Sequence, residues 1–245
     1  MWAISIKEFR QFFSNLTGLS AILVFLLMNG LMLFVFPDSN IFDFGYATLD
    51  RFFTLSPLIL LLLIPAITMR SFSDEFRSGT YEILQTRPLS RWQIVSGKYL
   101  GTLVVVIIAL LPTVIYIFSI QALSETGGID SGATIGSYIG LFFLAAVFCA
   151  IGLFCSSCSN NAVIAFIISA SACLLLYNGF ELISRIPAFN AGLDYYIGML
   201  GIDFHYRSIS RGVLDSRNAV YFLSMITFFL FLTHRNLGVD KGRSK

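Results

Sequence analysis

A run of 50 residues without one charged side chain, from 131 to 180, constrains the fold more than any other feature. As a single helix it would be about 75 Å long, whereas the hydrocarbon core of a bilayer is about 30 Å thick. The run must therefore turn back on itself. Its one polar cluster, Ser156 to Asn161, is where a turn is expected. We predict two membrane-spanning helices here, at about 134–155 and 162–182.

Composition agrees with lipid as the main solvent. The chain is 56% hydrophobic and 12% charged, whereas soluble domains carry about 25% charged residues. Four further apolar runs, each about as long as one of these two helices, predict four more spans. We therefore expect an all-α integral membrane protein with six transmembrane helices in one domain, residues 1–245. The four further spans are placed at about 16–36, 52–69, 99–122 and 218–235.

The first 15 residues form a separate pattern. Trp2, Ile6, Phe9 and Phe13 recur at spacings of three and four, and polar residues fill the positions between them. This periodicity predicts an amphipathic helix that lies in the membrane interface. The alternative is that residues 1–15 are only the start of the first span.

The basic residues indicate an orientation. Six spans place both termini on one side, together with residues 70–98. That side carries 11 of the 16 Lys and Arg residues, and the opposite side carries five. Because loops rich in Lys and Arg stay in the cytoplasm, we expect both termini and residues 70–98 to be cytoplasmic. The membrane would be the bacterial cytoplasmic (inner) membrane.

Residues 70–98, called here the hinge segment, hold five of the Lys and Arg residues and three of the 14 Asp and Glu residues. Ser71 has the capping-box spacing to Asp74, and Ser90 has it to Gln93. The spacing predicts a short helix before Pro88, with Glu75 and Glu82 on one face. A second helix would run from Ser90 through Lys98 into the third span. The alternative is an ordinary amphipathic cytoplasmic loop.

The order of residues from Glu75 to Pro88, followed by Gly97-Lys98, resembles the cytoplasmic signature of ABC-2-type transporter permeases. The turn Gly152 to Ser157 with Asn161 looks like the turn between spans four and five in that family. The resemblance implies a coupling helix that docks on a separate ATP-binding subunit. The residues implied for ATPase coupling are Asp74, Glu75, Arg77, Gly79, Thr80, Glu82, Pro88 and Lys98.

The outer loop, residues 184–217, resembles one branch of the family. Phe204-His205-Tyr206, Arg211 to Asp215 and Tyr221 to Ser224 are similar to the gliding-motility-associated and nitrous-oxide-reductase maturation permeases. We expect short interfacial helices here that close the exit side, or else an anchoring belt of aromatic residues. The candidate exit-side residues are Glu181, His205, Arg211 and Asp215.

Glu181 lies near the outer end of the fifth span. A carboxylate within a membrane segment is a functional candidate by default. The alternatives are that it is solvated, or that it pairs with Arg185 four residues later. Gly136 and Gly140 have the spacing of a helix-dimer motif, which fits a dimer seam or packing within one subunit.

No residue pattern indicates catalysis or a cofactor. The one Gly-Lys pair, Gly97-Lys98, has Trp92 where a phosphate-binding loop needs glycine. The net charge of +2 does not suggest nucleic acid. Cys155 and Cys158 have no second pair, and His205 and His234 fall on opposite sides of the membrane, so no metal site is expected.

The expected function is that of a permease subunit in a bacterial ATP-driven exporter associated with gliding motility. The expected partners are ABC ATPase subunits, which hold ATP and Mg, a second identical or related permease subunit, and membrane lipid. The alternative is a scaffold that anchors a motility or secretion apparatus without transport. No span shows the series of charged residues typical of an ion or proton pathway.

Overall fold

The computed structural model describes residues 2–14, 16–36, 48–86, 88–124, 129–186, 193–212 and 215–239. Every regular element within these ranges is helical, which confirms the all-α prediction. Five helical runs are long and apolar enough to cross a membrane, and α1 with α2 makes a sixth if this pair, bent by 73°, counts as one span. The five runs are Asp50–Arg77, Arg91–Leu123, Ser131–Ser157, Ala162–Ser184 and Ser216–Gly238.

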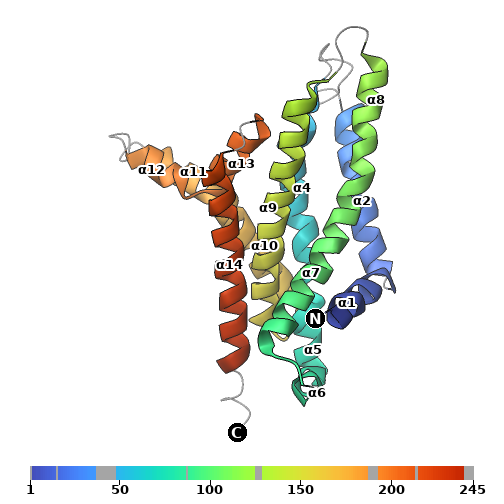
Figure 1. The fold of residues 1–245 in the computed structure, drawn as a ribbon, viewed down its shortest axis with the longest axis vertical. Coiled ribbons are helices and arrows are strands. Elements are labelled where there is room, and N and C mark those ends of the chain that lie inside the picture. Colours follow the sequence, from blue (N-terminus) through green and yellow to red (C-terminus); the bar gives the residue numbers. More distant parts are fainter. Residues whose placement is uncertain are drawn as a thin grey trace.

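Helix α1 (Trp2–Ser14) precedes the apolar helix α2 (Leu16–Phe34) and lies at the end of the bundle next to α7 (Arg91–Leu110) (Figure 1). A glycine of α7 allows α1 to pack closely against that helix. A Cβ atom at Gly101 of α7 would lie 2.8 Å from Cβ of Glu8. The predicted separate N-terminal helix is therefore present, and Ile4, Ser5 and Glu8 form the face that packs inward, whereas Lys7 and Arg10 stay exposed.

Helix α4 (Asp50–Thr68) continues almost directly into α5 (Arg70–Arg77). Met69 between them has helical torsion angles, φ −54° and ψ −32°, and no side chain caps α5. The prediction that Ser71 caps a new helix is therefore wrong. The chain turns only at Gly79, whose φ of +69° favours glycine.

Helix α6 (Thr80–Thr86) follows this turn. Glu75 and Glu82 consequently belong to two different helices, with Glu75 buried and Glu82 exposed, so the prediction of a shared face is wrong. The predicted break at Arg87 and Pro88 lies partly outside the described residues, because Arg87 is among those not described. Pro88 itself is exposed.

Helix α7 (Arg91–Leu110) begins with the predicted capping box. The Gln93 amide donates to the Ser90 hydroxyl at 3.3 Å, and the Ser90 amide donates to the Gln93 side chain at 3.0 Å. The helix runs past Lys98 without a break and continues through the short 3₁₀ helix η1 (Leu111–Val114) into α8 (Ile115–Leu123). The third spanning run therefore starts inside the hinge segment.

Helix α9 (Ser131–Ser157) is the centre of the bundle and packs against α4, α10, α13 and α14. A turn follows it at the predicted polar cluster. Asn161 then caps α10 (Ala162–Leu174), because its side chain accepts the Val163 amide at 2.9 Å. The run continues through η2 (Leu175–Gly179), a π-helical turn, into α11 (Phe180–Ser184).

The outer loop folds as two short helices, α12 (Leu193–Met199) and α13 (Ile202–Ser210), before the last span, α14 (Ser216–Val239). Helix α13 packs on the first half of α9. A Cβ atom at Gly140 would lie 3.1 Å from Ile209, and one at Gly136 would lie 3.1 Å from Gly212. The small-residue pair Gly136 and Gly140 therefore packs within this chain.

The two ends of the bundle differ. Helices α1, α5 and α6 and the last turns of α14 lie at one end, and α11, α12 and α13 project sideways farther toward the other (Figure 1). At the first end the Asn236 side chain donates to the Ser157 carbonyl at 2.8 Å, and the Trp92 ring stacks on His234 with centroids 4.5 Å apart. The basic tail residues after 239 lie outside the described residues.

Candidate functional site

A fully buried lysine lies at the centre of the hinge end. Lys98 Nζ is 2.6 Å from Glu8 Oε1, 3.0 Å from Glu75 Oε1 and 2.7 Å from the Ser71 carbonyl oxygen. Lys7 Nζ reaches the same Glu75 oxygen at 2.9 Å. We call Lys7, Glu8, Glu75 and Lys98 the charge cluster. Its two positive and two negative charges balance.

Burial explains why the cluster has this composition. A buried charge is costly unless it is paired and hydrogen-bonded. The Lys98 ammonium has three N–H donors, and two carboxylates and one carbonyl oxygen accept them. The Phe72 ring, whose centroid is 4.9 Å from Nζ, adds a cation–π contact. One side chain thereby joins α1, α5 and α7.

Helix α9 holds the start of α5 from another side. The Ser156 hydroxyl accepts the Phe72 amide at 3.0 Å and the Ser73 amide at 3.3 Å, and it donates to the Met69 carbonyl at 3.0 Å. One turn earlier, a Cβ atom at Gly152 would overlap the Thr68 hydroxyl. The junction of α4 and α5 is therefore packed directly on α9.

The predicted coupling residues fall into three groups by exposure. Glu75 and Lys98 belong to the charge cluster and are buried, so they cannot touch a soluble partner in this conformation. Asp74 is half-buried. The exposed members are Arg77, Gly79, Thr80 and Glu82, at or near the turn from α5 to α6, and Pro88, beyond the end of α6.

The sequence analysis missed Lys7 and Glu8 as part of this site. Their signal was their charge, because a charged side chain of an N-terminal helix that packs on a span needs a partner there. Spacing along the chain could not identify those partners, since Lys98 lies 90 residues after Glu8.

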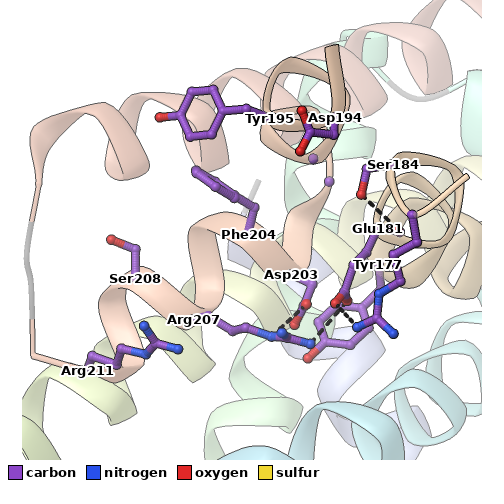
Figure 2. Close-up of a pocket in the computed structure, with 13 residues that line it drawn as sticks. Tyr177, Glu181, Ser184, Asp194, Tyr195, Asp203, Phe204, Arg207, Ser208 and Arg211 are labelled. Atoms are coloured by element: carbon purple, nitrogen blue, oxygen red, sulfur yellow. Dashed lines mark hydrogen bonds and ion pairs between the residues drawn. The ribbon is translucent and has the colours of Figure 1, made fainter. Parts of the chain in front are cut away.

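The second site is a cavity of about 760 Å³ between α11, α12 and α13 (Figure 2). Glu181 Oε1 lies 2.6 Å from Arg185 Nη2, which confirms the predicted pair four residues apart. Glu181 Oε2 also lies 3.1 Å from Arg207 Nη2, and Arg207 Nε lies 2.7 Å from Asp203 Oδ2. These four side chains form one ion-pair network with balanced charge.

Asp203 is the buried member of this network, with 4% of its surface exposed. Burial raises the pKa of its carboxyl group above the ordinary value of 3.8. Arg207 opposes this rise, and the Glu181 carboxylate adds to it. The neutral form of Asp203 is therefore easier to reach than that of an exposed aspartate.

The four exit-side candidates separate in the structure. Glu181 and Arg211 line the cavity. His205 is buried beside it, with Nδ1 2.7 Å from Asn218 Oδ1 and its ring stacked on Tyr221 at 3.9 Å. Asp215 accepts the Arg217 amide at 3.0 Å at the start of α14. His205 and Asp215 thus hold the loop in place and do not face the cavity.

Within the described ranges, no group of three His, Cys, Asp or Glu side chains has an arrangement that could hold a metal ion. His205 packs at the α13 end of α14, and His234 packs at the opposite end against Trp92. Cys149, Cys155 and Cys173 are buried thiols.

These features define a multi-pass helical membrane protein whose polar hinge segment is bonded to α1 and α9. The family model for ABC-2 family transporter proteins matches residues 2–237, nearly the whole chain, and the chain belongs to this family. It is therefore the membrane component of an ABC transporter, and its family implies an ABC ATPase subunit as partner. No curated protein matches the sequence significantly.

Proposed function

We propose that this chain is the permease subunit of a bacterial ABC-2 exporter associated with gliding motility, in the cytoplasmic membrane. In this proposal a separate ATPase subunit docks on the turn between α5 and α6. The observation that carries the proposal is that the turn between α5 and α6 is polar and exposed, whereas α5 itself is bonded to neighbouring helices. A force on that turn reaches α5, and α5 is bonded to α1, α7 and α9.

The exposed side chains Arg77 and Glu82 offer a partner one positive and one negative charge. The charge cluster lies behind them and converts local displacement into movement of the spans. Glu75 and Lys98 act in this scheme through α1 and α7, without touching the partner. ATP and Mg belong to the ATPase subunit.

The orientation in the proposal follows from charge. The segments expected from the sequence on the side of α1, α5 and α6 carry 11 of the 16 Lys and Arg residues, which favours the cytoplasmic side. A second permease subunit, identical or related, would complete the translocation path. Because α13 covers Gly136 and Gly140, that subunit would contact other faces of the bundle.

The proposal is tested by purifying the chain together with the ABC ATPase encoded next to it and measuring ATP hydrolysis. We expect the double variant Arg77→Ala/Glu82→Ala to lower permease-stimulated hydrolysis by about tenfold, because charges at an interface speed association and loss of a paired charge speeds dissociation. The matched control is Arg217→Ala at the other end, which should leave hydrolysis unchanged. Full stimulation by the double variant would refute docking at this turn.

A partner ATPase that binds but cannot hydrolyse ATP separates transport from anchoring. A transporter loses its cellular phenotype with such a partner, and a scaffold keeps it. Gliding is the phenotype to score, and retention of gliding would favour the scaffold.

A further inference from the structure

Two charges in the outer cavity remain after the ion-pair network is accounted for. Glu181, Asp203, Arg185 and Arg207 neutralise one another. Arg211 and Asp194 also line the cavity, and neither has an ion-pair partner among the residues that the structure describes. The cavity therefore offers one unpaired positive charge and one unpaired negative charge to a ligand.

These two charges lie at different places on the wall. Asp194 is on α12, and Arg211 lies just beyond the end of α13, with Phe204 between them in the view of Figure 2. A ligand with a single charge would meet an attractive group at one place and a repulsive group at the other. A zwitterion satisfies both.

The surroundings of each charge indicate which end of the zwitterion it takes. Tyr195 and Phe204 line the same cavity as Asp194, with their rings edge to face at 5.7 Å and 57% and 37% of their surfaces exposed. A carboxylate and exposed aromatic rings on the wall of one cavity favour an ammonium group, which can pair with the carboxylate or lie over a ring.

The Arg211 end suits a phosphate. A guanidinium matches the geometry of phosphate oxygens. The Ser208 hydroxyl lines the same part of the cavity, and it accepts the Asn218 amide at 3.1 Å, so its own proton is free to donate to an oxyanion.

The position of the cavity fits the headgroup region of a bilayer. It lies between the end of the run Ala162–Ser184 and the start of α14, beside the first half of α9. Its volume of about 760 Å³ is within the range of small-molecule sites.

We propose that this cavity binds a phosphoethanolamine-type zwitterion, with its phosphate at Arg211 and Ser208 and its ammonium at Asp194 and Tyr195. The shared chemistry could be supplied by a membrane lipid headgroup or by a soluble phosphoamine. The proposal goes beyond the proposed function and does not require that the bound group be transported.

The test is a binding titration of the purified, detergent-solubilised protein. The probes are short-chain phosphatidylethanolamine, the corresponding phosphatidylglycerol, which lacks the ammonium, and free glycerophosphoethanolamine. We expect the ethanolamine lipid to bind about tenfold tighter than the glycerol lipid, the size of effect typical of one charged hydrogen bond. Binding of glycerophosphoethanolamine as tight as that of the lipid indicates a soluble ligand, and weaker binding indicates a lipid.

Variants assign the two ends. Arg211→Gln should weaken both lipids by about tenfold. Asp194→Asn should weaken the ethanolamine lipid alone, and Asp194→Lys should reverse the preference in favour of phosphatidylglycerol. The matched control is Arg217→Gln, an exposed arginine at the same end that does not line the cavity.

Equal binding of the two lipids by the wild type would overturn the proposal. An equal loss of binding in Arg217→Gln and Arg211→Gln would also overturn it. Because Asp194→Lys predicts a gain for one probe, a variant that misfolds cannot imitate the expected result.

Discussion

Lys98 Nζ lies 2.6 Å from Glu8 Oε1, where the lysine side chain is 1% exposed. This contact joins the N-terminal helix to the third spanning run. Helix α1 is therefore more than an interfacial anchor, because its Glu8 carboxylate supplies the counter-charge for a buried cation. The packing of the hinge end therefore depends on both Glu8 of α1 and Lys98 of α7.

The first prediction concerns that contact. Lys98→Met leaves the Glu8 and Glu75 carboxylates buried without their main partner, and we expect it to destabilise the fold by about 3–5 kcal/mol. Thermal unfolding in detergent measures the change. The control is Lys7→Met, whose half-exposed side chain should cost about 1 kcal/mol or less. Equal effects of the two variants would contradict the assigned role of burial.

The second prediction concerns Ser156. In Ser156→Ala the Phe72 and Ser73 amides lose their hydroxyl acceptor, and we expect a cost of about 1–3 kcal/mol. Hydrogen exchange should become faster at these two amides in particular. Ser224→Ala is the control, because its exposed hydroxyl bonds only within its own helix. Unchanged exchange at both amides would exclude this anchoring role.

The third prediction concerns the crossing of α4 and α9. A methyl group at Gly152 would overlap Thr68, so Gly152→Ala should force the helices apart and cost about 1–3 kcal/mol. The melting temperature of the purified protein measures this cost. Gly198→Ala, where nothing lies within 4 Å of the new methyl group, should have little effect. A Gly152→Ala variant as stable as wild type would show that the crossing can relax.

The fourth prediction concerns pH. The raised pKa of Asp203 means that the folded state binds its proton more tightly than the unfolded state. Its contribution to stability is complete below the ordinary pKa of 3.8 and is lost as pH rises through the raised value. The stability of wild type relative to Asp203→Asn should therefore fall as pH rises above about 4. Melting temperatures of both proteins across this range test the sign, and a rising difference would contradict it.

Local patterns in the sequence predicted the local parts of the fold. Length and hydropathy indicated the long apolar helices that could cross a membrane, and the Ser90 capping box and the Glu181–Arg185 pair depend only on residues three and four apart. The capping-box spacing from Ser71 to Asp74 wrongly predicted the start of a new helix. There α4 simply continues, and the Ser71 hydroxyl instead donates to Glu8 at 3.3 Å.

The candidate sites depend on packing between distant segments. Glu181 was recognisable as a membrane carboxylate, but its contact with Arg207 exists only because α13 folds back beside α11. The charge cluster likewise needs α1 to lie on α7. No spacing rule joins Glu8 to Lys98, since any of several acidic residues could have met this lysine. The coupling role of the exposed hinge residues stays a prediction.

The run Asp50–Arg77 has 28 residues, and it reaches from the α6 turn to the far side of the bundle. Near its first turn, the Phe53 carbonyl accepts the Tyr206 hydroxyl of α13 at 2.6 Å. A helix of this length is about 42 Å long, so a tilt of about 10° around its midpoint moves each end by roughly 4 Å in opposite directions. If the ATPase displaces the α6 turn, as we propose, this run would act as a lever, with one arm at that turn and the other bonded to the helix that lines the outer cavity.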